Sequence, residues 1–224
     1  MKKIVTVIVA FCIFAVDNVF AQIGPNVDWA GFSRYSQTNM YVDHAPKAVF
    51  MGDSITDNWG RMQADFFDDN DILCRGISGQ TTSQMLVRFR KDVVALHPEY
   101  VLIMAGTNDI ARNTGMIAHD DIAGNIASMC EIARSNGIKP VIVSITPADH
   151  YGWRMDIKDA AEQIIHVNEL LRQYAEESDI PYVDLHSVMV NDKGGLPVEL
   201  SKDGVHPTLA GYNVMGPLVL ETIK

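Results

Sequence analysis

Basic residues are few in this chain of 224 residues, which has 18 Lys and Arg against 28 Asp and Glu. Removing residues 1–21, with Lys2, Lys3 and Asp17, leaves 16 basic and 27 acidic residues and a net charge of −11. A surface of that sign repels phosphate groups. Nucleic acid and anionic membranes are therefore poor partners for this protein.

Cysteine is also scarce, with three residues in the whole chain. Cys12 lies in an apolar run near the start, so only Cys74 and Cys130 could pair within the body of the protein. Cys74 falls in a predicted strand, and Cys130 falls on the apolar face of a predicted helix. We expect two buried thiols rather than a disulfide, although the sequence alone leaves the bridge open.

Motifs of two hydrolase classes are missing. No G-x-S-x-G pentapeptide occurs, which excludes the nucleophile elbow of an α/β-hydrolase. The histidines other than His206 show no H-x-x-x-H or comparable spacing, so a metal-dependent deacetylase or phosphatase is not indicated. We predict no metal site and no cofactor.

Long hydrophobic runs are confined to the first residues. Two lysines precede an uncharged apolar run at 4–16, and small residues lead to Ala21, which is typical of a secretory signal peptide cleaved near Ala21. A retained anchor is the weaker alternative, because a spanning helix needs roughly 20 apolar residues. We therefore expect an exported protein, periplasmic or extracellular, without a stable membrane anchor, in which residues 22–224 form one domain.

Short apolar runs recur along that domain and predict buried strands. They lie at 48–51, 72–74, 100–105, 140–145 and 182–185. Helix-period segments lie between or after them, near 85–96, 122–133, 157–178 and 209–218. This alternation predicts an α/β fold, a three-layer α/β/α sandwich around a mostly parallel five-stranded sheet. Residues 22–47 precede it as an N-terminal arm, which we expect to pack through Trp29, Phe32 and Tyr35 at helix-compatible spacing.

A serine follows the first predicted strand, in Gly52-Asp53-Ser54-Ile55-Thr56-Asp57. Sites in such sheets lie at the carboxyl ends of the strands, so Ser54 is a candidate nucleophile. Taken alone, Ser54 could equally be a helix N-cap. Only its combination with the other blocks favours the chemical role.

Blocks after the second and third strands supply candidate oxyanion donors. Gly79, in Arg75-Gly76-Ile77-Ser78-Gly79-Gln80-Thr81, lets the backbone approach a ligand and point its amide at it. Asn108, in Gly106-Thr107-Asn108-Asp109, could donate through its side-chain amide to a developing negative oxygen. The plainer alternatives are a simple turn at Gly79 and local backbone hydrogen bonds at Asn108.

The last block is Asp203-Gly204-Val205-His206-Pro207. A carboxylate three residues before an imidazole can bend back through Gly204 and accept a hydrogen bond from the ring Nδ1. With Ser54 upstream, these residues make a triad in which His206 is the base and Asp203 orients it.

The four blocks resemble those of the GDSL/SGNH hydrolases, whose defining residues are Ser, Gly, Asn and His in that order. The match spans Val49 to about Tyr212, and it departs from the family name where Ile55 replaces Leu. The resemblance implies the flavodoxin-like SGNH fold and no metal. It also implies that Ser54 attacks, that His206 takes its proton, and that Asp203 holds the imidazole. The oxyanion hole would be formed by the backbone amides of Ser54 and Gly79 and the side chain of Asn108.

Substrate choice depends on loops, and the loop after the fourth strand carries Tyr151 and Trp153. Trp153 would stack on a sugar or close a small acyl pocket, unless it only covers the end of the sheet. We take Asp53, Tyr151 and Trp153 as candidate substrate-binding residues. The leading hypothesis is removal of a small acyl group, acetyl above all, from a carbohydrate or similar ester.

Two alternatives stay open. A lysophospholipase, thioesterase or platelet-activating-factor-like acylhydrolase would prefer longer acyl chains. A glycan-binding protein on the same scaffold would bind without turnover, but it would have no need for Ser54, Asp203 and His206 together. The expected partner in each case is a small molecule or a glycan, and the sequence does not indicate an oligomeric state.

Overall fold

The computed structural model describes residues 28–224, so the predicted signal peptide at 1–21 lies outside the described residues. Its strands form one sheet in the order β2-β1-β3-β4-β5. They are β1 (Ala48–Gly52), β2 (Ile72–Gly76), β3 (Tyr100–Met104), β4 (Lys139–Val143) and β5 (Tyr182–Val183). Every neighbouring pair is parallel, which confirms the predicted sheet and makes it parallel throughout. β5 has two residues and is shorter than predicted.

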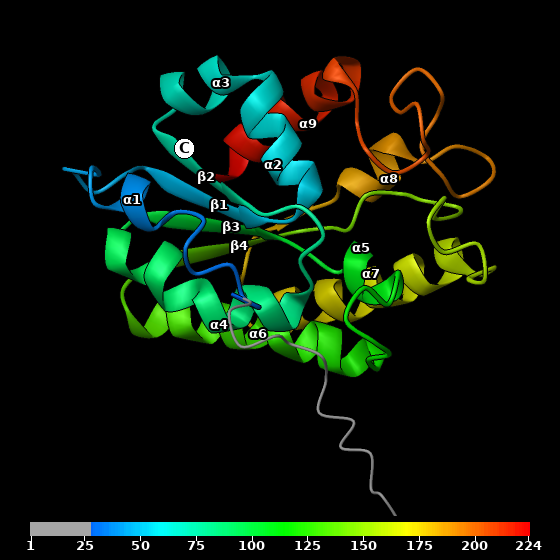
Figure 1. The fold of residues 1–224 in the computed structure, drawn as a ribbon, viewed down its shortest axis with the longest axis horizontal. Coiled ribbons are helices and arrows are strands. Elements are labelled where there is room, and N and C mark those ends of the chain that lie inside the picture. Colours follow the sequence, from blue (N-terminus) through cyan, green and yellow to red (C-terminus); the bar gives the residue numbers. More distant parts are fainter. Residues whose placement is uncertain (1–27) are drawn as a thin grey trace, which may run out of the picture.

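Helices cover both faces of the sheet. They are α1 (Ser36–Asn39), α2 (Ser54–Met62), α3 (Ala64–Asp69), α4 (Thr82–Asp92), α5 (Thr107–Ile110), α6 (His119–Ser135), α7 (Ala160–Glu177), α8 (Leu185–Met189) and α9 (Leu209–Thr222), with a 3-10 turn η1 at Val94–Leu96. Figure 1 shows α4, α6 and α7 on one face and α2, α3, α8 and α9 on the other. The three-layer α/β/α sandwich is confirmed.

Local signals explain where these helices begin and end. Thr81 and Gln84 form a capping box at the start of α4. After α6, Gly137 takes a positive φ of 76°, a conformation that glycine commonly adopts just past the end of a helix. The predicted helix at 85–96 ends earlier, at Asp92, and continues only as η1. Within residues 28–224, no helix has both the length and the apolar character needed to cross a bilayer.

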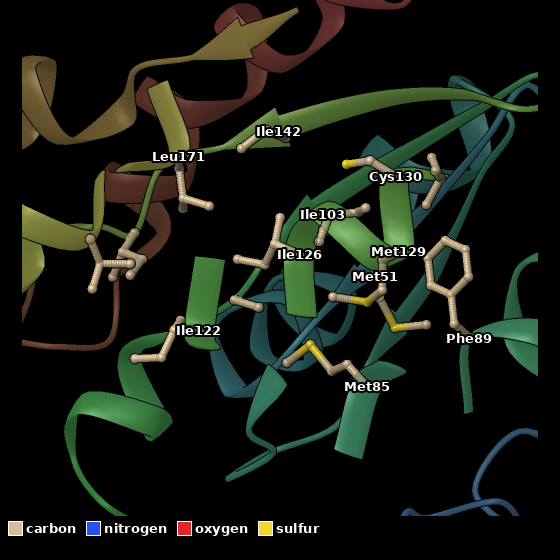
Figure 2. Close-up of a cluster of buried hydrophobic side chains, with 14 of the residues drawn as sticks. Met51, Met85, Phe89, Ile103, Ile122, Ile126, Met129, Cys130, Ile142 and Leu171 are labelled. Atoms are coloured by element: carbon tan, nitrogen blue, oxygen red, sulfur yellow. The ribbon is translucent and has the colours of Figure 1, made fainter. Parts of the chain in front are cut away.

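The strands are buried on both faces, as expected of a parallel sheet between two helical layers. In β1, Val49 and Met51 point toward α4, α6 and α7, whereas Ala48 and Phe50 point toward the opposite layer. Figure 2 shows the cluster of buried side chains between the sheet and α4, α6 and α7, in which Met51 from β1 meets side chains of α4 and α6.

The two cysteines of the body lie on opposite faces of the sheet. Cys130 belongs to the cluster of Figure 2, and Cys74 packs against the cluster on the other face. Within residues 28–224 both thiols are free, so the expected absence of a bridge between Cys74 and Cys130 is confirmed. Cys130 is fully buried, whereas Cys74 is only partly buried.

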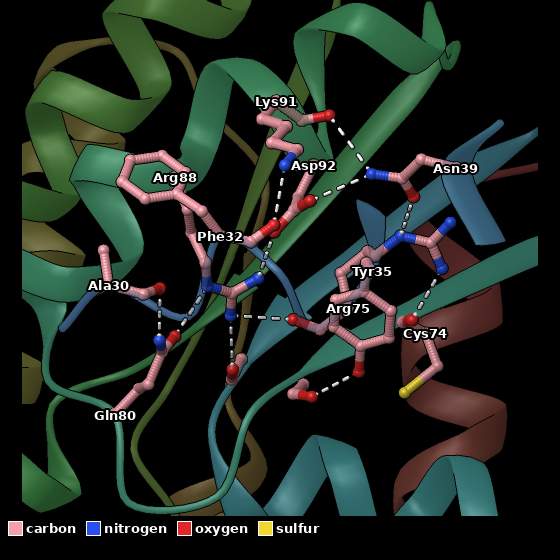
Figure 3. Close-up of polar contacts among 12 residues, drawn as sticks. Ala30, Phe32, Tyr35, Asn39, Cys74, Arg75, Gln80, Arg88, Lys91 and Asp92 are labelled. Atoms are coloured by element: carbon pink, nitrogen blue, oxygen red, sulfur yellow. Dashed lines mark hydrogen bonds and ion pairs between the residues drawn. The ribbon is translucent and has the colours of Figure 1, made fainter. Parts of the chain in front are cut away.

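The arm preceding β1 differs in detail from the expectation. Residues 29–35 form turns rather than a helix, and α1 covers only the four residues that follow. Tyr35 is buried, but Trp29 and Phe32 are 38% and 39% exposed. Polar contacts also hold this arm: the Tyr35 hydroxyl donates to the carbonyl of Gly76, and Gln80 Nε2 donates to the carbonyl of Ala30 at 2.7 Å (Figure 3).

Candidate active site

Ser54 is the first residue of α2 and follows β1 after a single intervening residue. That residue, Asp53, is the N-cap of α2, and its carboxylate accepts from the backbone N–H of Ile55 at 2.9 Å. This turn brings the Ser54 hydroxyl to 2.9 Å from Nε2 of His206. Ser54 and His206 are 152 positions apart in the sequence, so only the fold brings them together.

The imidazole of His206 is held from its other side by Asp203. His206 Nδ1 lies 2.7 Å from Asp203 Oδ2, while Asp203 Oδ1 accepts from the backbone N–H groups of Val205 at 3.0 Å and His206 at 2.8 Å. The loop can close this tightly because Gly204 takes a positive φ of 80°. Since a carboxylate only accepts, Nδ1 carries the proton and Nε2 is left to accept from the Ser54 hydroxyl.

These hydrogen bonds favour the ionised form of the Asp203 carboxyl group. Partial burial raises the pKa of the carboxyl, but the backbone N–H of His206, its ring and the N–H of Val205 outweigh that effect and lower the pKa to about 2. Asp203 is therefore ionised across the neutral range and can stabilise an imidazolium on His206.

The predicted oxyanion donors lie at the ends of the three neighbouring strands β1, β2 and β3. Among residues 28–224, the backbone N–H groups of Ser54 and Gly79 donate to no other protein group. Gly79 holds a positive φ of 81°, which glycine adopts without strain. Asn108 is buried, and its Nδ2 donates to the carbonyl of Gln80 at 3.0 Å. An amide nitrogen has two hydrogens, so one remains for a substrate oxygen.

A buried arginine that the sequence analysis missed ties two of these loops together. Arg88 of α4 donates from Nη2 to the carbonyls of Gly52 at 3.2 Å and Arg75 at 2.9 Å. Its Nε donates to Gln80 Oε1 at 2.6 Å, and its Nη1 pairs with Asp92 at 3.1 Å (Figure 3). The signal was present in the sequence, because position 88 falls on the inward face of α4 and Asp92 follows at i+4.

Asp57 had no role assigned from the sequence, and the structure gives it a supporting one. Its carboxylate is buried and accepts from the Ser78 hydroxyl at 2.8 Å and from Arg34 at 3.3 Å. Ser78 immediately precedes Gly79, so Asp57 joins α2 to the loop of Gly79, a predicted oxyanion donor, and to the N-terminal arm.

A model of GDSL-like lipases and acylhydrolases matches residues 50–214. The chain belongs to the GDSL-like lipase/acylhydrolase family. The resemblance drawn from the four blocks is thereby confirmed, and so is the enzyme class, a carboxylic ester hydrolase. Among solved structures, a GDSL-like lipase from Bacteroides thetaiotaomicron VPI-5482 is 44% identical, with a TM-score of 0.85. That likeness covers 87% of this chain and 97% of the other.

More distant relatives of this GDSL-family chain include two bacterial proteins. An acetylxylan esterase from Geobacillus stearothermophilus is 25% identical over 217 residues, which are 82% of this chain and 96% of that protein. An uncharacterized lipoprotein, YqeF, from Bacillus subtilis (strain 168) is 29% identical over 142 residues. That second match covers 56% of this chain and 58% of the lipoprotein.

The candidate substrate-binding residues of this GDSL-family site separate in the structure. Asp53 is buried beneath Ser54 as a helix cap, and Tyr151 is fully buried with its hydroxyl 3.1 Å from Thr107 Oγ1. Both side chains are buried in this structure, and their assignment as substrate-binding residues stays a prediction. Trp153 is 46% exposed, and its ring centroid lies 6.1 Å from that of His206, so it alone of the three lies open beside the triad.

Proposed function

We propose that this chain is a serine ester hydrolase that acts through an acyl-enzyme, with Ser54 as nucleophile, His206 as base and Asp203 as the residue that orients the base. The observation that carries this proposal is the continuous hydrogen-bonded chain from the Ser54 hydroxyl through His206 to Asp203. The backbone N–H groups of Ser54 and Gly79 support it, since within residues 28–224 they donate to no protein group and are suited to a developing oxyanion.

The reaction follows from these contacts. The Ser54 oxygen forms a bond to the ester carbonyl carbon as its proton passes to Nε2 of His206, and the carbonyl oxygen becomes negative between the donors of Ser54, Gly79 and Asn108. Collapse of that intermediate breaks the ester C–O bond, and the leaving alcohol takes the proton from His206. Water then attacks the acyl group through the same base, which releases the acid and restores Ser54.

For the substrate we propose a short acyl group, acetyl above all, esterified to a carbohydrate. Trp153 supports the sugar side, because an exposed indole beside the nucleophile offers a flat apolar face to a pyranose ring. The relation to an acetylxylan esterase supports the same choice.

A chain-length series tests this substrate class. The mature chain should hydrolyse p-nitrophenyl acetate with a kcat/KM at least about tenfold above that for the octanoate, and it should release acetate from acetylated xylo-oligosaccharides. Trp153→Ala should raise KM for the oligosaccharide more than for p-nitrophenyl acetate, whereas Trp29→Ala, a change at an exposed tryptophan far from the triad in sequence, should alter neither. Preference for the octanoate would instead favour the long-chain acylhydrolase, and glycan binding without acetate release would favour the non-catalytic alternative.

We also propose that the protein is exported. The two lysines and the apolar run at 4–16 support this, and one relative is a lipoprotein. Expression of the full chain in a bacterial host, followed by intact mass of the periplasmic and medium fractions, should give a protein beginning at Gln22. An uncleaved protein retained in the membrane or the cytoplasm would contradict the proposal.

A further inference from the structure

The side-chain amide of Asn113, in the loop after α5, forms hydrogen bonds with three residues of the site. Its Nδ2 donates to Asn108 Oδ1 at 2.8 Å and to the carbonyl of Gly79 at 3.2 Å. Its Oδ1 accepts from the indole N–H of Trp153 at 3.2 Å. Asn113 is an exposed residue, so its contacts concern the site rather than the core.

The first of these contacts sets the orientation of the Asn108 amide. Asn108 Oδ1 faces the Asn113 donor, while Asn108 Nδ2 faces the carbonyl of Gln80 at 3.0 Å. A flip of the Asn108 amide would place two NH2 groups together on one side and two oxygens together on the other. Asn113 therefore keeps the second Nδ2 hydrogen of Asn108, rather than its oxygen, available to the oxyanion.

The second contact fixes the loop that carries the other donor. Gly79 lies in the left-handed region and has no side chain to hold it, so the peptide groups on either side of it rotate easily. The bond from Asn113 to the Gly79 carbonyl restrains that rotation from outside the loop. The backbone N–H of Asn113 completes the link by donating to the carbonyl of Asn108 at 3.0 Å.

The third contact extends the same link to the open side of the site. The ring of Trp153 lies beside His206 and 5.3 Å from the ring of the buried Tyr151, and its N–H points to Asn113. The side-chain amide of Asn113 thus links Asn108 and Gly79, the two predicted oxyanion donors other than Ser54, to the exposed ring of Trp153.

We propose that Asn113 is a positioning residue that orients the oxyanion donors Asn108 and Gly79 and sets the place of Trp153. The inference rests on the proposed serine-esterase function, because it concerns the donors that act only when a tetrahedral intermediate forms.

Three variants at position 113 and its neighbour test the inference. Asn113→Ala should lower kcat on p-nitrophenyl acetate by about tenfold or more and change KM less than about twofold, because the donors act in the transition state. Asn113→Asp, which has the same shape, should lower kcat further, since a carboxylate cannot donate to Asn108 or Gly79 and places negative charge near the oxyanion. Thr114→Ala, on the same exposed loop, should stay within about twofold of wild type.

A double-variant cycle separates this role from a structural one. The change in log kcat caused by Asn113→Ala should be at least about two thirds smaller in an Asn108→Ala background than in wild type. The reason is that the Asn108 amide, which Asn113 orients, is absent from that background. The melting temperatures of both position-113 variants should match wild type. An equal loss of kcat in both backgrounds, a change confined to KM, or a loss of stability in place of kcat would overturn the inference.

Ser54→Ala, measured beside these variants, separates this inference from the function beneath it. If Ser54→Ala is inactive while Asn113→Ala behaves as wild type, only the role of Asn113 fails. If Ser54→Ala retains the turnover of wild type, the proposed serine-esterase mechanism fails, and the role of Asn113 fails with it.

Discussion

Replacing Arg88 with methionine should be among the most damaging single changes outside the triad. Arg88 and Asp92 are both fully buried, and the guanidinium makes hydrogen bonds to the carbonyls of Gly52 and Arg75, to Gln80 and to Asp92. Methionine fills a similar volume but donates no hydrogen bond, so the Arg75 carbonyl and Gln80 Oε1 lose their bonds from Arg88, while the Gly52 carbonyl keeps its bond from the backbone N–H of Ile77 at 3.1 Å. Asp92 keeps only its bond from Asn39 at 2.9 Å.

The size of the effect follows from the buried charge. Removing one partner of a buried ion pair typically costs about 3–5 kcal/mol, because the other charge is left uncompensated. For a protein of this length, that loss should lower the melting temperature by roughly 6–20 °C. Because Gly52 and Gln80 belong to the loops at Ser54 and Gly79, kcat should fall as well when it is measured well below the melting temperature.

Urea denaturation followed by fluorescence measures the loss directly. Arg88→Met should lower the midpoint at an unchanged m-value. Arg90→Met, at an exposed position of the same helix, is the matched control and should stay within about 0.5 kcal/mol of wild type. Arg88→Met combined with Asp92→Asn should be more stable than Arg88→Met alone. A single variant as stable as the Arg90 control would refute the reasoning.

Two further predictions follow from the site and the core. Burial raises the pKa of Asp53 to about 6, so the native state binds this proton more tightly than the unfolded chain and the free energy of unfolding falls as pH rises from about 4 to 7. Asp53→Asn, which keeps the cap, should therefore be about 1–3 kcal/mol more stable than wild type at pH 7, and equal stability in thermal melts would contradict this. Because burial raises the pKa of the Cys130 thiol to about 12, Cys130 should react with a thiol reagent only after unfolding, and dithiothreitol should leave the melting temperature unchanged; rapid labelling of Cys130 in the folded protein would refute its burial.

The sheet and its layers were predictable because each rests on a strong local signal. Continuous apolar runs such as 100–104 indicate strands buried on both faces, and the helix-period segments between them require crossovers. The ends of elements were less predictable. The run at 182–185 predicts a four-residue strand, but only two of its residues pair with β4, and the chain turns into α8 at Leu185.

The triad could be predicted because its members stand in short blocks with turn residues at fixed positions, as Gly204 does between Asp203 and His206. Residues that act through tertiary hydrogen bonds gave weaker signals. Asn113 is one polar residue in a polar loop, and no periodicity marks its contacts with Gly79 and Trp153. The burial of Tyr151 could not be predicted either, since an aromatic residue in a loop near the site can be exposed or buried, and here it is buried.

The most direct test of the account asks whether Ser54 is the nucleophile. The mature chain beginning at Gln22 and its Ser54→Ala variant would be treated with a fluorophosphonate probe, and intact mass and p-nitrophenyl acetate hydrolysis would be measured on both. The account predicts that wild type turns over and gains one phosphonyl group, while Ser54→Ala does neither although it folds and melts as wild type does. Equal labelling and equal turnover of the two proteins would contradict it.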